Sequence, residues 1–470
     1  MSEANYDVII IGAGPGGYVA AVRCSQLGLK AAIVERDTRL GGTCLLRGCI
    51  PTKALLECAH VYDKARESAK YGVITTGVSL DFGAVQGYRE KTVATNSKGV
   101  QFLMRKNKVE VLSGHGRLAG KGKVSVTAAD GTVTTVAAKH VILATGSKCK
   151  DFPGITIDHK QIVNSDDILE IKSVPKSLVV LGAGAVGSEF ASVYASFGAK
   201  VTLVEYADVI LPIEDEEVSK ELEKIYKKRG IDVRTATSIS KAEVAGDVVK
   251  ITLTPKAGGD SVVIEAEMLL VAAGRAAVTG DIGAAGTGVK VDERGFVDVN
   301  EFCQTGEPGV YAIGDIIKTP WLAHVASHEA VLVAEHIAGK HPHPIRYDRV
   351  PNCTYCDPEV ASVGLTEKAA RAKGYDVKVG MFPFAANGKA RIMGSEGGFI
   401  KIVADKKHDE LLGVHIVGPK ATELISEAVL ALELESTVEE LFHAMHPHPT
   451  LAEAMGEAAA AAFLGAPLNA

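Results

Sequence analysis

Near its start the chain carries a continuous apolar run that leads into a glycine-rich turn. Residues 6–11 (YDVIII) are apolar without alternation, which predicts a strand buried on both faces of a parallel sheet. A glycine-rich stretch follows at residues 12–17, and a helical stretch then runs to about Leu27. A second apolar run, residues 31–34, ends at Glu35. This order of segments predicts a βαβ unit.

The same order of segments occurs again in the middle of the chain. Residues 177–181 (SLVVL) form an apolar run that leads into a second glycine-rich turn at residues 182–187. A helical stretch and a further apolar run, residues 200–204, follow and end at Glu205. The pattern therefore predicts an internal repeat of one βαβ unit.

Other segments indicate where the domains end. Residues 140–146 (HVILATG) predict a buried strand, and the polar, Pro/Gly-containing sequence after it indicates a boundary. Residues 268–275 (MLLVAAGR) close the second unit, and from about Tyr347 the chain is first strand-rich and then helix-rich. We expect an α/β fold of two Rossmann-like dinucleotide-binding domains, a central domain and a C-terminal α+β domain, with the boundaries 1–149, 150–275, 276–346 and 347–470.

One helix of the last block has an apolar stripe. The stretch ATELISEAVLALE places apolar side chains at Leu424, Ile425, Val429, Leu430 and Leu432. Such a stripe is typical of a contact surface between two copies of a chain. A helix that only covers the strands of its own domain has the same pattern, so the sequence leaves both interpretations open.

Composition and charge restrict the partners and the compartment. The 470 residues carry a formal net charge of -6 and no run of basic residues, so neither nucleic acid nor an anionic membrane is an expected partner. No apolar stretch is long enough to span a membrane, and the first predicted strand leaves no room for a signal peptide. We therefore expect a cytoplasmic protein, in which a disulfide among the eight cysteines is catalytic rather than structural.

Both glycine-rich turns have the spacing of a dinucleotide-binding fingerprint. The first glycine makes the turn, the second lets the backbone approach a pyrophosphate, and the third lets the helix pack on the strand. An acidic residue at the end of the next strand binds ribose hydroxyls. The residues concerned are Gly12, Gly14 and Gly17 with Glu35, and Gly182, Gly184 and Gly187 with Glu205.

Glycines that merely permit tight packing are the alternative explanation, and it is serious for a single GxGxxG. The complete βαβ context is matched twice, which favours two nucleotide sites. Two such sites suit an enzyme that transfers electrons between two dinucleotides. A carboxylate at Glu205 accepts hydrogen bonds from a 2′-hydroxyl and repels a 2′-phosphate, which favours NAD over NADP.

A pair of cysteines follows the first nucleotide unit. Cys44 and Cys49 are separated by four residues, a spacing that a helical or near-helical turn can bridge. Pro51 is compatible with the first turn of a helix that begins there, and a helix N-terminus favours thiolate at Cys49. Two unrelated core cysteines are the alternative, but the position directly after a nucleotide fingerprint favours a redox pair.

A histidine and a glutamate near the C-terminus suit acid–base chemistry. Thiol–disulfide exchange needs a base that generates the attacking thiolate and an acid that protonates the leaving thiol. His448 has the residue type for this role, and Glu453 can fix its tautomer and orientation. A solvated surface histidine is the alternative interpretation.

Together these motifs resemble the pyridine nucleotide–disulfide oxidoreductases, and among them the dihydrolipoamide dehydrogenase subfamily. The segments that carry the resemblance extend over essentially the whole chain. They are GGTC-x4-CIPTKALL (41–56), ATG (144–146), YAIGD (311–315), LAHVASHEA (322–330), DPEVASVGLTE (357–367) and HPTLAEA (448–454).

The resemblance implies a role for each residue of the reaction centre. It implies that Cys44 exchanges with the substrate and that Cys49 lies against the flavin as a charge-transfer thiolate. It implies that His448 is the acid–base residue and that Glu453 orients it. The expected reaction is the oxidation of protein-bound dihydrolipoamide by NAD through the disulfide and FAD.

The resemblance also implies the contacts of both cofactors. Glu35 binds the adenosine ribose of FAD and Glu205 that of NAD, while Asp315 holds the ribityl chain. Lys53 and Glu189 form an ion pair beside the flavin. Further cofactor contacts are expected at Gly12, Gly14, Gly17, Gly116, Thr145, Gly146, Gly182, Gly184, Gly187, Gly274 and Ala323, and no metal ligand is expected.

The implied assembly is a homodimer in which His448 of one chain serves Cys44 of the other. The implied partners are the lipoyl-bearing acyltransferase and the subunit-binding domain of 2-oxo acid dehydrogenase complexes.

Some positions depart from the family pattern. Leu-Arg at residues 46–47 replaces the frequent Asn-Val, so that Arg47 adds a charge between the redox cysteines and is expected to alter their potential. Ala-Val at residues 277–278 replaces Pro-Asn in a loop on the FAD side. Cys353 and Cys356 form an additional CxxC, which we interpret as ordinary strand cysteines because no second pair of zinc ligands is evident.

Related activities fit the sequence less well. Glutathione reductase uses NADP, and arginines are expected there instead of Glu205. Mercuric reductase resembles a chain with a paired-cysteine tail, whereas this sequence ends GAPLNA. A single-cysteine transhydrogenase is excluded by the second cysteine, and the intact cysteine and His–Glu pairs argue against a flavin-bound scaffold without turnover.

Overall fold

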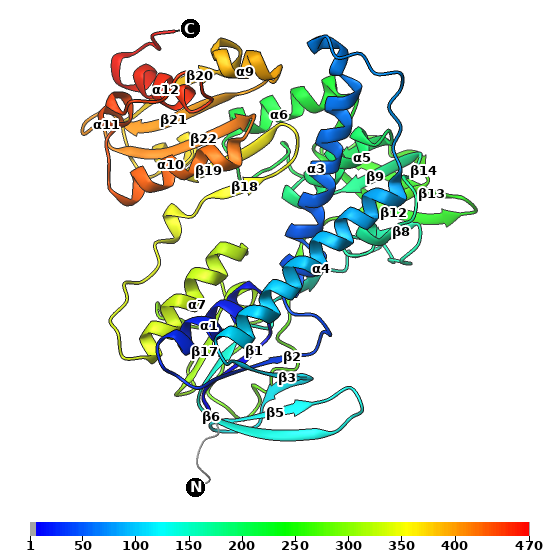
Figure 1. Ribbon diagram of the computed structural model, residues 1–470. Helices are drawn as coiled ribbons and strands as arrows, with labels where there is room; N and C mark the ends of the chain where they lie inside the picture. The colour runs from blue at the N-terminus through cyan, green and yellow to red at the C-terminus, as the bar shows by residue number, and fades with distance from the viewer. Residues whose placement is uncertain (1–5, 470) are drawn as a thin grey trace. The chain divides into compact units, whose positions relative to one another are not determined.

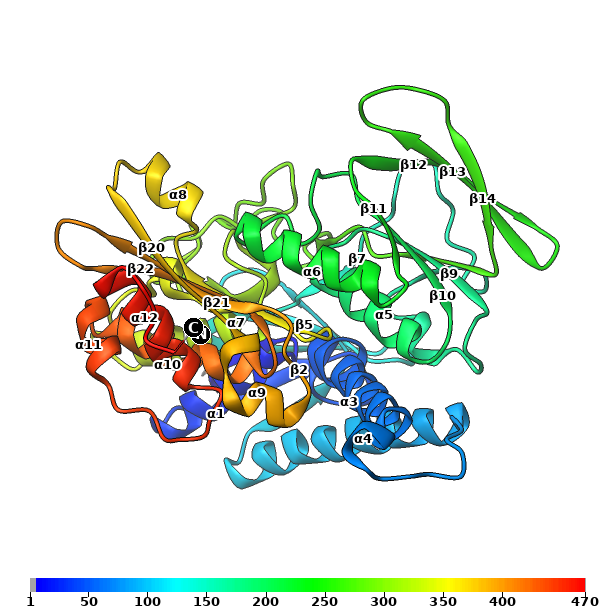
Figure 2. The same cartoon turned by 90° about the horizontal axis from the view of Figure 1, so that it is seen from above.

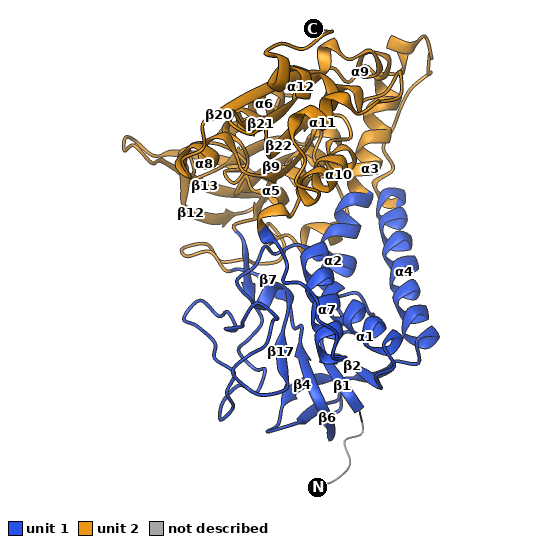
Figure 3. Ribbon diagram, turned by 90° about the vertical axis from the view of Figure 1, so that its left-hand side faces the viewer, with its two compact units in different colours: residues 1–54, 84–150, 274–347 blue, residues 55–83, 151–273, 348–470 orange. Residues whose placement is uncertain are grey.

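The computed structural model describes residues 6–469, which divide into two compact units (Figure 3). Unit 1 is formed by residues 1–54, 84–150 and 274–347, and unit 2 by the remaining residues. Helices α3 (Cys49–Arg66) and α4 (Phe82–Lys106) contain residues of both units. Among the described residues, no helix has the length and apolarity needed to cross a membrane.

Unit 1 is built on a seven-stranded sheet. Its strands have the order β3-β2-β1-β6-β5-β4, and β17 also pairs with β6. They are β1 (Tyr6–Ile11), β2 (Ala31–Glu35), β3 (Glu110–Ser113), β4 (His115–Leu118), β5 (Lys123–Thr127), β6 (Val133–Leu143) and β17 (Val310–Ala312). Strands β1, β2, β3, the second half of β6 and β17 are parallel, whereas the first half of β6 pairs with β5 in antiparallel fashion.

Helices α1 (Pro15–Gln26) and α7 (Ala323–Ile337) lie side by side in unit 1 (Figure 1). Gly16 permits this close approach, because a Cβ on it would lie 3.3 Å from the carbonyl oxygen of Ala326. The apolar run of β1 is buried as the sequence predicted, with Val8, Ile9 and Ile10 inaccessible to solvent. Burial on both faces of a parallel sheet explains why the run has no polar alternation.

Unit 2 contains a second parallel sheet with the order β11-β10-β9-β15-β8. Its strands are β8 (Ile162–Asn164), β9 (Ser177–Leu181), β10 (Lys200–Val204), β11 (Asp232–Arg234) and β15 (Met268–Val271), and its helices are α5 (Ala185–Ser196) and α6 (Glu216–Lys228). Strands β12 (Thr237–Ala245), β13 (Val248–Pro255) and β14 (Val262–Ala266) form a separate antiparallel sheet (Figure 2). The predicted repeat of the βαβ unit is thus confirmed.

The last part of unit 2 is an antiparallel sheet with the order β18-β19-β22-β21-β20. Its strands are β18 (Asn352–Thr354), β19 (Glu359–Gly364), β20 (Val377–Pro383), β21 (Phe399–Asp405) and β22 (Leu411–Gly418), and its helices are α8 (Glu367–Ala372), α9 (Gly388–Met393), α10 (Ala421–Glu433), α11 (Val438–His443) and α12 (Glu453–Leu464). Helix α10 packs on β19 and β22, and α12 packs on β20 and β21. The predicted α/β class is confirmed, including an α+β block at the end.

Helix α10 uses only part of its apolar stripe within its own chain. Ile425 and Leu432 are buried in the core of this block, whereas Leu430 is 61% exposed and the following Leu434 is 69% exposed. The helix therefore covers its own strands and also presents apolar side chains to solvent.

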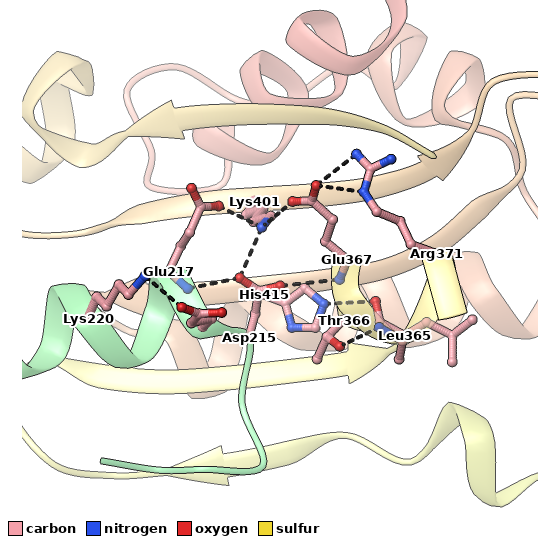
Figure 4. A network of polar contacts seen from close by, with 11 residues as sticks. Asp215, Glu217, Lys220, Leu365, Thr366, Glu367, Arg371, Lys401 and His415 are labelled. Carbon is pink, nitrogen blue, oxygen red and sulfur yellow. Dashed lines mark hydrogen bonds and ion pairs between the residues drawn. The ribbon is translucent and has the colours of Figure 1, made fainter. Parts of the chain in front are cut away.

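A buried ammonium group joins three elements of unit 2 (Figure 4). Lys401 on β21 is 1% exposed, and its Nζ lies 3.0 Å from Asp215 Oδ1, 2.6 Å from Glu217 Oε2 and 2.8 Å from Glu367 Oε2. Asp215 precedes α6 and its carboxylate accepts the backbone N–H of Glu217. The three donors of one ammonium are therefore satisfied by three carboxylates, which fixes α6 and α8 against β21.

Candidate active site

The first glycine-rich turn joins β1 to α1 in unit 1. Gly12 has φ +105°, and a Cβ on it would lie 2.3 Å from the carbonyl oxygen of Ala144. A Cβ on Gly17 would lie 1.8 Å from the carbonyl oxygen of Gly12. Gly14 differs, because its backbone is in an ordinary extended conformation and a Cβ there would meet only the Gly42 Cα, at 4.0 Å. The fold itself thus requires the first and third glycines but not the second.

The second turn, between β9 and α5 in unit 2, repeats this geometry. A Cβ on Gly182 would lie 2.7 Å from the carbonyl oxygen of Ala272, and one on Gly187 would lie 1.8 Å from that of Gly182. A Cβ on Gly184 would have no heavy atom within 4 Å. Gly184 therefore leaves space beside the helix N-terminus that neither packing nor backbone strain explains.

The space beside Gly14 and Gly184 fits the pyrophosphate of a dinucleotide. Each glycine directly precedes a helix of 12 residues, whose first N–H groups lack partners within the helix. A negatively charged group in that space is favoured by these N–H groups and by the helix dipole. The residues present thus fit two dinucleotides, one on each turn.

The two acidic residues of the fingerprint are held in the same way. The backbone N–H of Ala13 donates to Glu35 Oε2 at 2.7 Å, and that of Ala183 donates to Glu205 Oε2 at 2.7 Å. The other oxygen of each carboxylate accepts a backbone N–H two residues further along the chain, at 2.9 Å for Glu35 and 2.8 Å for Glu205. A carboxylate has about four lone-pair positions, so each glutamate keeps capacity for ribose hydroxyls.

The Arg47 side chain extends from α2 (Gly42–Arg47) toward the end of β2, where Glu35 lies. Its guanidinium forms an ion pair with Asp37, two residues beyond Glu35. Burial raises the pKa of Glu35, and backbone hydrogen bonds and the charge of Arg47 oppose this. The expected influence of Arg47 on the potential of the two cysteines stays a prediction. What the structure shows for Arg47 is an ion pair just beyond the end of β2.

The segment that carries the cysteines is attached directly to the first dinucleotide turn. The backbone N–H of Gly41 donates to the carbonyl oxygen of Ala13 at 3.0 Å. Gly42 begins α2, and a Cβ on it would lie 2.5 Å from the Gly14 Cα. The start of α2 therefore packs against the space assigned to the pyrophosphate.

Cys44 lies within α2 and Cys49 is the first residue of α3, with Gly48 between the two helices. A side chain at Gly48 would be crowded, because its Cβ would lie 3.0 Å from the carbonyl oxygen of Thr43. A hydrogen bond with the Cys49 sulfur, burial and the charge of Cys49 raise the pKa of the Cys44 thiol, and Lys53 opposes this. The two cysteines are thus neighbours, which agrees with their spacing in the sequence, and their redox role stays a prediction.

Tyr18 on α1 is a neighbour of the cysteines that sequence reasoning missed. Burial raises the pKa of its hydroxyl, and the charges of Cys44 and Cys49 add to this. A single tyrosine one residue after a glycine motif has no distinguishing pattern in the sequence.

Residues from three distant segments meet around Asp315 in unit 1. Asp315 follows β17, and its carboxylate accepts the hydroxyl of Ser147. Arg275 Nε donates to the same Ser147 Oγ at 2.7 Å. Thr145 Oγ1 donates to the carbonyl oxygen of Val278 at 2.6 Å, so the predicted ATG segment and the loop after residue 274 are adjacent. Burial raises the pKa of Asp315.

Glu329 on α7 supports the backbone beside Asp315 and was also missed from the sequence. The backbone N–H of Gly314 donates to Glu329 Oε2 at 2.6 Å, and Tyr347 Oη donates to Glu329 Oε1 at 3.0 Å. Burial raises the pKa of this carboxyl to about 7.

The other residues that are predicted to contact a cofactor differ in their local surroundings. Gly116 is packed, because a Cβ on it would lie 2.9 Å from Val34 Cγ1. Gly146 and Gly274 have φ of +71° and +105° with open space around the Cα, and Ala323 begins α7. Their contacts with a cofactor stay predictions.

Lys53 and Glu189 are placed on two different helices. Lys53 lies on α3 within unit 1, and Glu189 lies on α5 within unit 2. Glu189 is buried, and its Oε1 accepts the backbone N–H of Tyr355 at 2.9 Å. The predicted ion pair between Lys53 and Glu189 stays a prediction.

His448 and Glu453 form the pair that the sequence predicted. His448 Nδ1 lies 2.8 Å from Glu453 Oε1, while Glu453 Oε2 accepts the backbone N–H of Thr450 at 2.8 Å. Burial opposes ionisation of Glu453, but the hydrogen bonds from Thr450 and His448 prevail and lower its pKa. The His448 side chain is 79% exposed, so the imidazole is oriented through Nδ1 and its other nitrogen is left for chemistry.

A second histidine–glutamate pair lies next to the first. His446 Nε2 lies 2.8 Å from Glu427 Oε1 on α10, and this contact raises the pKa of His446. A Cβ on Gly456 in α12 would lie 3.0 Å from His446 Nδ1. His446 thus fills the space between α10 and α12 just before the His448 loop.

Cys356, the second cysteine of the additional CxxC, has the properties of a structural residue. Cys356 is buried and its Sγ donates to the carbonyl oxygen of Pro358 at 3.2 Å. Burial raises the pKa of Cys356 to about 12, which disfavours the thiolate needed for exchange or for metal binding. Within residues 6–469, no group of three or more His, Cys, Asp or Glu side chains has an arrangement that suits a metal ion.

Comparison with known proteins agrees with this geometry. Residues 6–330 match the family described as pyridine nucleotide-disulphide oxidoreductase, and residues 350–459 match the dimerisation domain of the same family. The chain is 48% identical over 465 residues to a dihydrolipoyl dehydrogenase of Bacillus subtilis, which covers 97% of this chain and 98% of that protein. It is 44% identical over 458 residues to a mitochondrial dihydrolipoyl dehydrogenase of Pisum sativum, with coverage of 97% and 91%.

A solved structure has the same fold. The crystal structure of LpdA from Mycobacterium tuberculosis superimposes with a TM-score of 0.89 at 26% identity, over 96% of this chain and 98% of that one.

Proposed function

The chain belongs to the pyridine nucleotide–disulphide oxidoreductase family, and on this premise we propose that it is an NAD-dependent dihydrolipoyl dehydrogenase. It oxidises protein-bound dihydrolipoamide to lipoamide and reduces NAD. The observation that carries this proposal is the attachment of the Cys44–Cys49 segment to the first dinucleotide turn, through the 3.0 Å hydrogen bond from Gly41 to Ala13.

The cofactors are FAD on the first turn and NAD on the second. Gly14 and Glu35 hold the pyrophosphate and adenosine ribose of FAD, and Gly184 and Glu205 hold the same groups of NAD. Bound FAD supplies an electron carrier between the cysteine pair and the nicotinamide. Asp315 holds the ribityl chain, and Ser147 and Glu329 keep the segment of Asp315 in place.

The chain's own residues carry out the thiol–disulfide exchange. In the oxidised enzyme Cys44 and Cys49 form a disulfide, and His448 removes a proton from one substrate thiol. The substrate thiolate attacks Cys44, so that a substrate–Cys44 disulfide forms and the Cys44–Cys49 bond breaks with Cys49 as the leaving thiolate. The second substrate thiol then displaces Cys44, which releases oxidised lipoamide and leaves both cysteines reduced.

Glu453 makes His448 effective in this step. Its carboxylate fixes the tautomer in which Nδ1 carries hydrogen, so Nε2 is the nitrogen that accepts the substrate proton. The imidazolium that forms is stabilised by the same carboxylate, and the proton is then available for a leaving thiolate.

NAD is the expected nicotinamide cofactor because Glu205 follows β10, at the position where the dinucleotide fingerprint has the acidic residue for the ribose hydroxyls. A carboxylate accepts hydrogen bonds from the 2′-hydroxyl and repels a phosphate. This charge also argues against a glutathione reductase activity that depends on NADP.

The finer assembly is also part of the proposal. We expect a homodimer in which His448 of one subunit serves Cys44 of the other, with the exposed Leu430 of α10 and Leu434 directly after this helix at the contact. Its partners are a lipoyl-bearing acyltransferase and a subunit-binding domain of a 2-oxo acid dehydrogenase complex. A cytoplasmic location suits cysteines that cycle between thiol and disulfide.

A steady-state assay with three substrates tests this function. Dihydrolipoamide, glutathione disulfide and mercuric ion are compared in parallel, each with both nicotinamides. The highest kcat/KM is expected for dihydrolipoamide with NAD. A higher value for glutathione disulfide or mercuric ion would contradict the proposal, and flavin that NADH fails to reduce would indicate a scaffold without turnover.

A further inference from the structure

The loop that carries His448 is held by hydrogen bonds to Thr450. The Thr450 backbone N–H donates to Glu453 and the Thr450 hydroxyl donates to the carbonyl oxygen of Pro447 at 2.7 Å. Both of these partners belong to the same short segment as Thr450. The third bond differs, because the Thr450 carbonyl oxygen accepts from Asn387 Nδ2 at 3.0 Å, 63 residues away in the chain.

Asn387 is itself firmly placed. It is 4% exposed and precedes α9, and its Oδ1 accepts the backbone N–H of Ala390 at 2.9 Å. The two partners define the orientation of the amide, because Ala390 offers only a donor and the Thr450 carbonyl only an acceptor. One buried amide thus caps α9 and anchors the His448 loop.

The imidazole of His448 depends on such an anchor. Its side chain is 79% exposed, so core packing does not fix it, and its contact with Glu453 ties the ring to the first residue of α12, which packs on β20 and β21. A displacement of about 1 Å in a reacting group costs up to about 100-fold in rate. The bond from Asn387 adds a second attachment, which joins the His448 loop to the start of α9.

We propose that Asn387 is a positioning residue for dihydrolipoamide oxidation: through the Thr450 carbonyl oxygen its side-chain amide holds the His448–Glu453 pair where it can take the substrate proton. The inference rests on the proposed function. It assigns to Asn387 a second task besides capping α9, and that task requires the Nδ2 donor.

Two substitutions separate the tasks. Serine is as good an N-cap as asparagine, so Asn387→Ser keeps the cap of α9 but has no donor that reaches Thr450. Asn387→Ala loses both bonds. Thr366→Ala is the matched control, because Thr366 caps α8 through the Ala369 N–H at 3.1 Å and has no bond to the His448 loop.

The kinetic readout is the rate of flavin reduction in the holoenzyme, measured separately with dihydrolipoamide and with NADH. Asn387→Ser and Asn387→Ala are both expected to slow the reaction with dihydrolipoamide by about 10-fold, because His448 takes part in it. Reduction by NADH, which does not need His448, should stay within about twofold of wild type. Thr366→Ala should change neither rate. A wild-type rate for Asn387→Ser, or equal slowing of both reactions, would overturn the proposal.

Hydrogen exchange gives a readout that needs no substrate. The peptide that spans residues 444–455 should exchange faster in Asn387→Ser than in wild type or Thr366→Ala, because the Thr450 N–H loses protection when the loop is released. Unchanged exchange there overturns the inference about Asn387. Failure of wild-type enzyme to oxidise dihydrolipoamide, with faster exchange in Asn387→Ser, would instead count against the proposed function alone.

Discussion

The backbone N–H of Gly41 donates to the carbonyl oxygen of Ala13 at 3.0 Å, which brings the start of the cysteine segment onto the first dinucleotide turn. Gly42 then packs against Gly14, so close that a Cβ on Gly42 would lie 2.5 Å from the Gly14 Cα. The segment that carries Cys44 and Cys49 is therefore attached to the turn on which we expect a pyrophosphate. This attachment supports the proposal that the two cysteines exchange electrons with a dinucleotide bound there.

Replacing the second glycine of a turn by alanine should leave folding unchanged but weaken dinucleotide binding. Gly184→Ala adds a methyl group where no heavy atom lies within 4 Å, so thermal stability and FAD content should match wild type. The methyl group occupies the phosphate space, and the KM for NAD should rise about 10-fold or more. Gly187→Ala is the contrasting variant, because its Cβ would lie 1.8 Å from the Gly182 carbonyl oxygen and should lower the melting temperature. A wild-type KM in Gly184→Ala would contradict this assignment.

Glu205 should set the preference for NAD. Glu205→Ala removes both the hydrogen bond to the 2′-hydroxyl and the repulsion of a 2′-phosphate, so the ratio of kcat/KM for NAD over NADP should fall. Steady-state kinetics with both nucleotides measure this ratio. Comparable kcat/KM for the two cofactors in wild-type enzyme would refute the role of Glu205.

Cys44 and Cys49 should be the cysteines needed for turnover. Cys44→Ser and Cys49→Ser should each abolish dihydrolipoamide oxidation, because neither variant can form the disulfide that the substrate attacks. NADH-dependent reduction of an artificial electron acceptor should persist, since it does not require the pair. Cys356→Ser is the control and should keep the wild-type rate, as the buried Cys356 thiol has a pKa of about 12. Normal activity of Cys44→Ser would place the redox centre elsewhere.

Lys401 should contribute strongly to the free energy of unfolding at neutral pH. Lys401→Met leaves Asp215 and Glu367 without their shared cation, and breaking such a buried pair costs about 3–5 kcal/mol in the free energy of unfolding. Lys220→Met on α6 is the matched control, since the ion pair of Lys220 with Glu216 is exposed to solvent, and the variant should have the stability of wild type.

The same network predicts the direction of a pH effect. Burial opposes ionisation of Asp215, but Lys401 outweighs it and lowers the pKa of Asp215; hydrogen bonds with Lys401 and Arg371 lower that of Glu367. Their stabilisation is therefore present above the unfolded pKa values of about 4 and is lost as pH falls through the lower folded values. Urea unfolding from about pH 7 to about pH 3, a range that includes the unfolded pKa values, measures this effect. The free energy of unfolding should fall more steeply with acid for wild type than for Lys401→Met. Parallel pH curves for the two proteins would show that Lys401 does not control these carboxylates.

A mixture of two inactive variants should regain activity if His448 acts across a dimer. Coexpressed Cys44→Ser and His448→Gln chains form heterodimers with one site that has both defects and one that has neither. Because one of its two sites is intact, each heterodimer should have nearly half of the wild-type activity. Isolated heterodimers that stay inactive, while wild-type enzyme treated in the same way recovers, would place His448 in its own chain's site.

The sequence by itself was sufficient for features that are local in the chain. The two βαβ units, their glycines and Glu35 and Glu205 are recognisable because a strand, a turn and a helix N-terminus follow one another within about 30 residues. Hydrophobic period and spacing encode such units directly. The Cys44–Cys49 pair and the pair His448–Glu453, whose members are five residues apart, are also local, but the resemblance to the family was needed to favour a functional role for the histidine.

Only the tertiary structure decided which residues of separate elements meet. Asn387 meets Thr450, Lys401 meets Asp215 and Arg47 turns to Asp37 because separate elements pack together, and no pattern along the chain marks these partners. The structure also separated glycines that the fold requires, such as Gly17, from Gly184, beside which the space is open. Sequence patterns specify local conformation, whereas contacts between distant residues depend on how sheets and helices pack, a property of the whole fold.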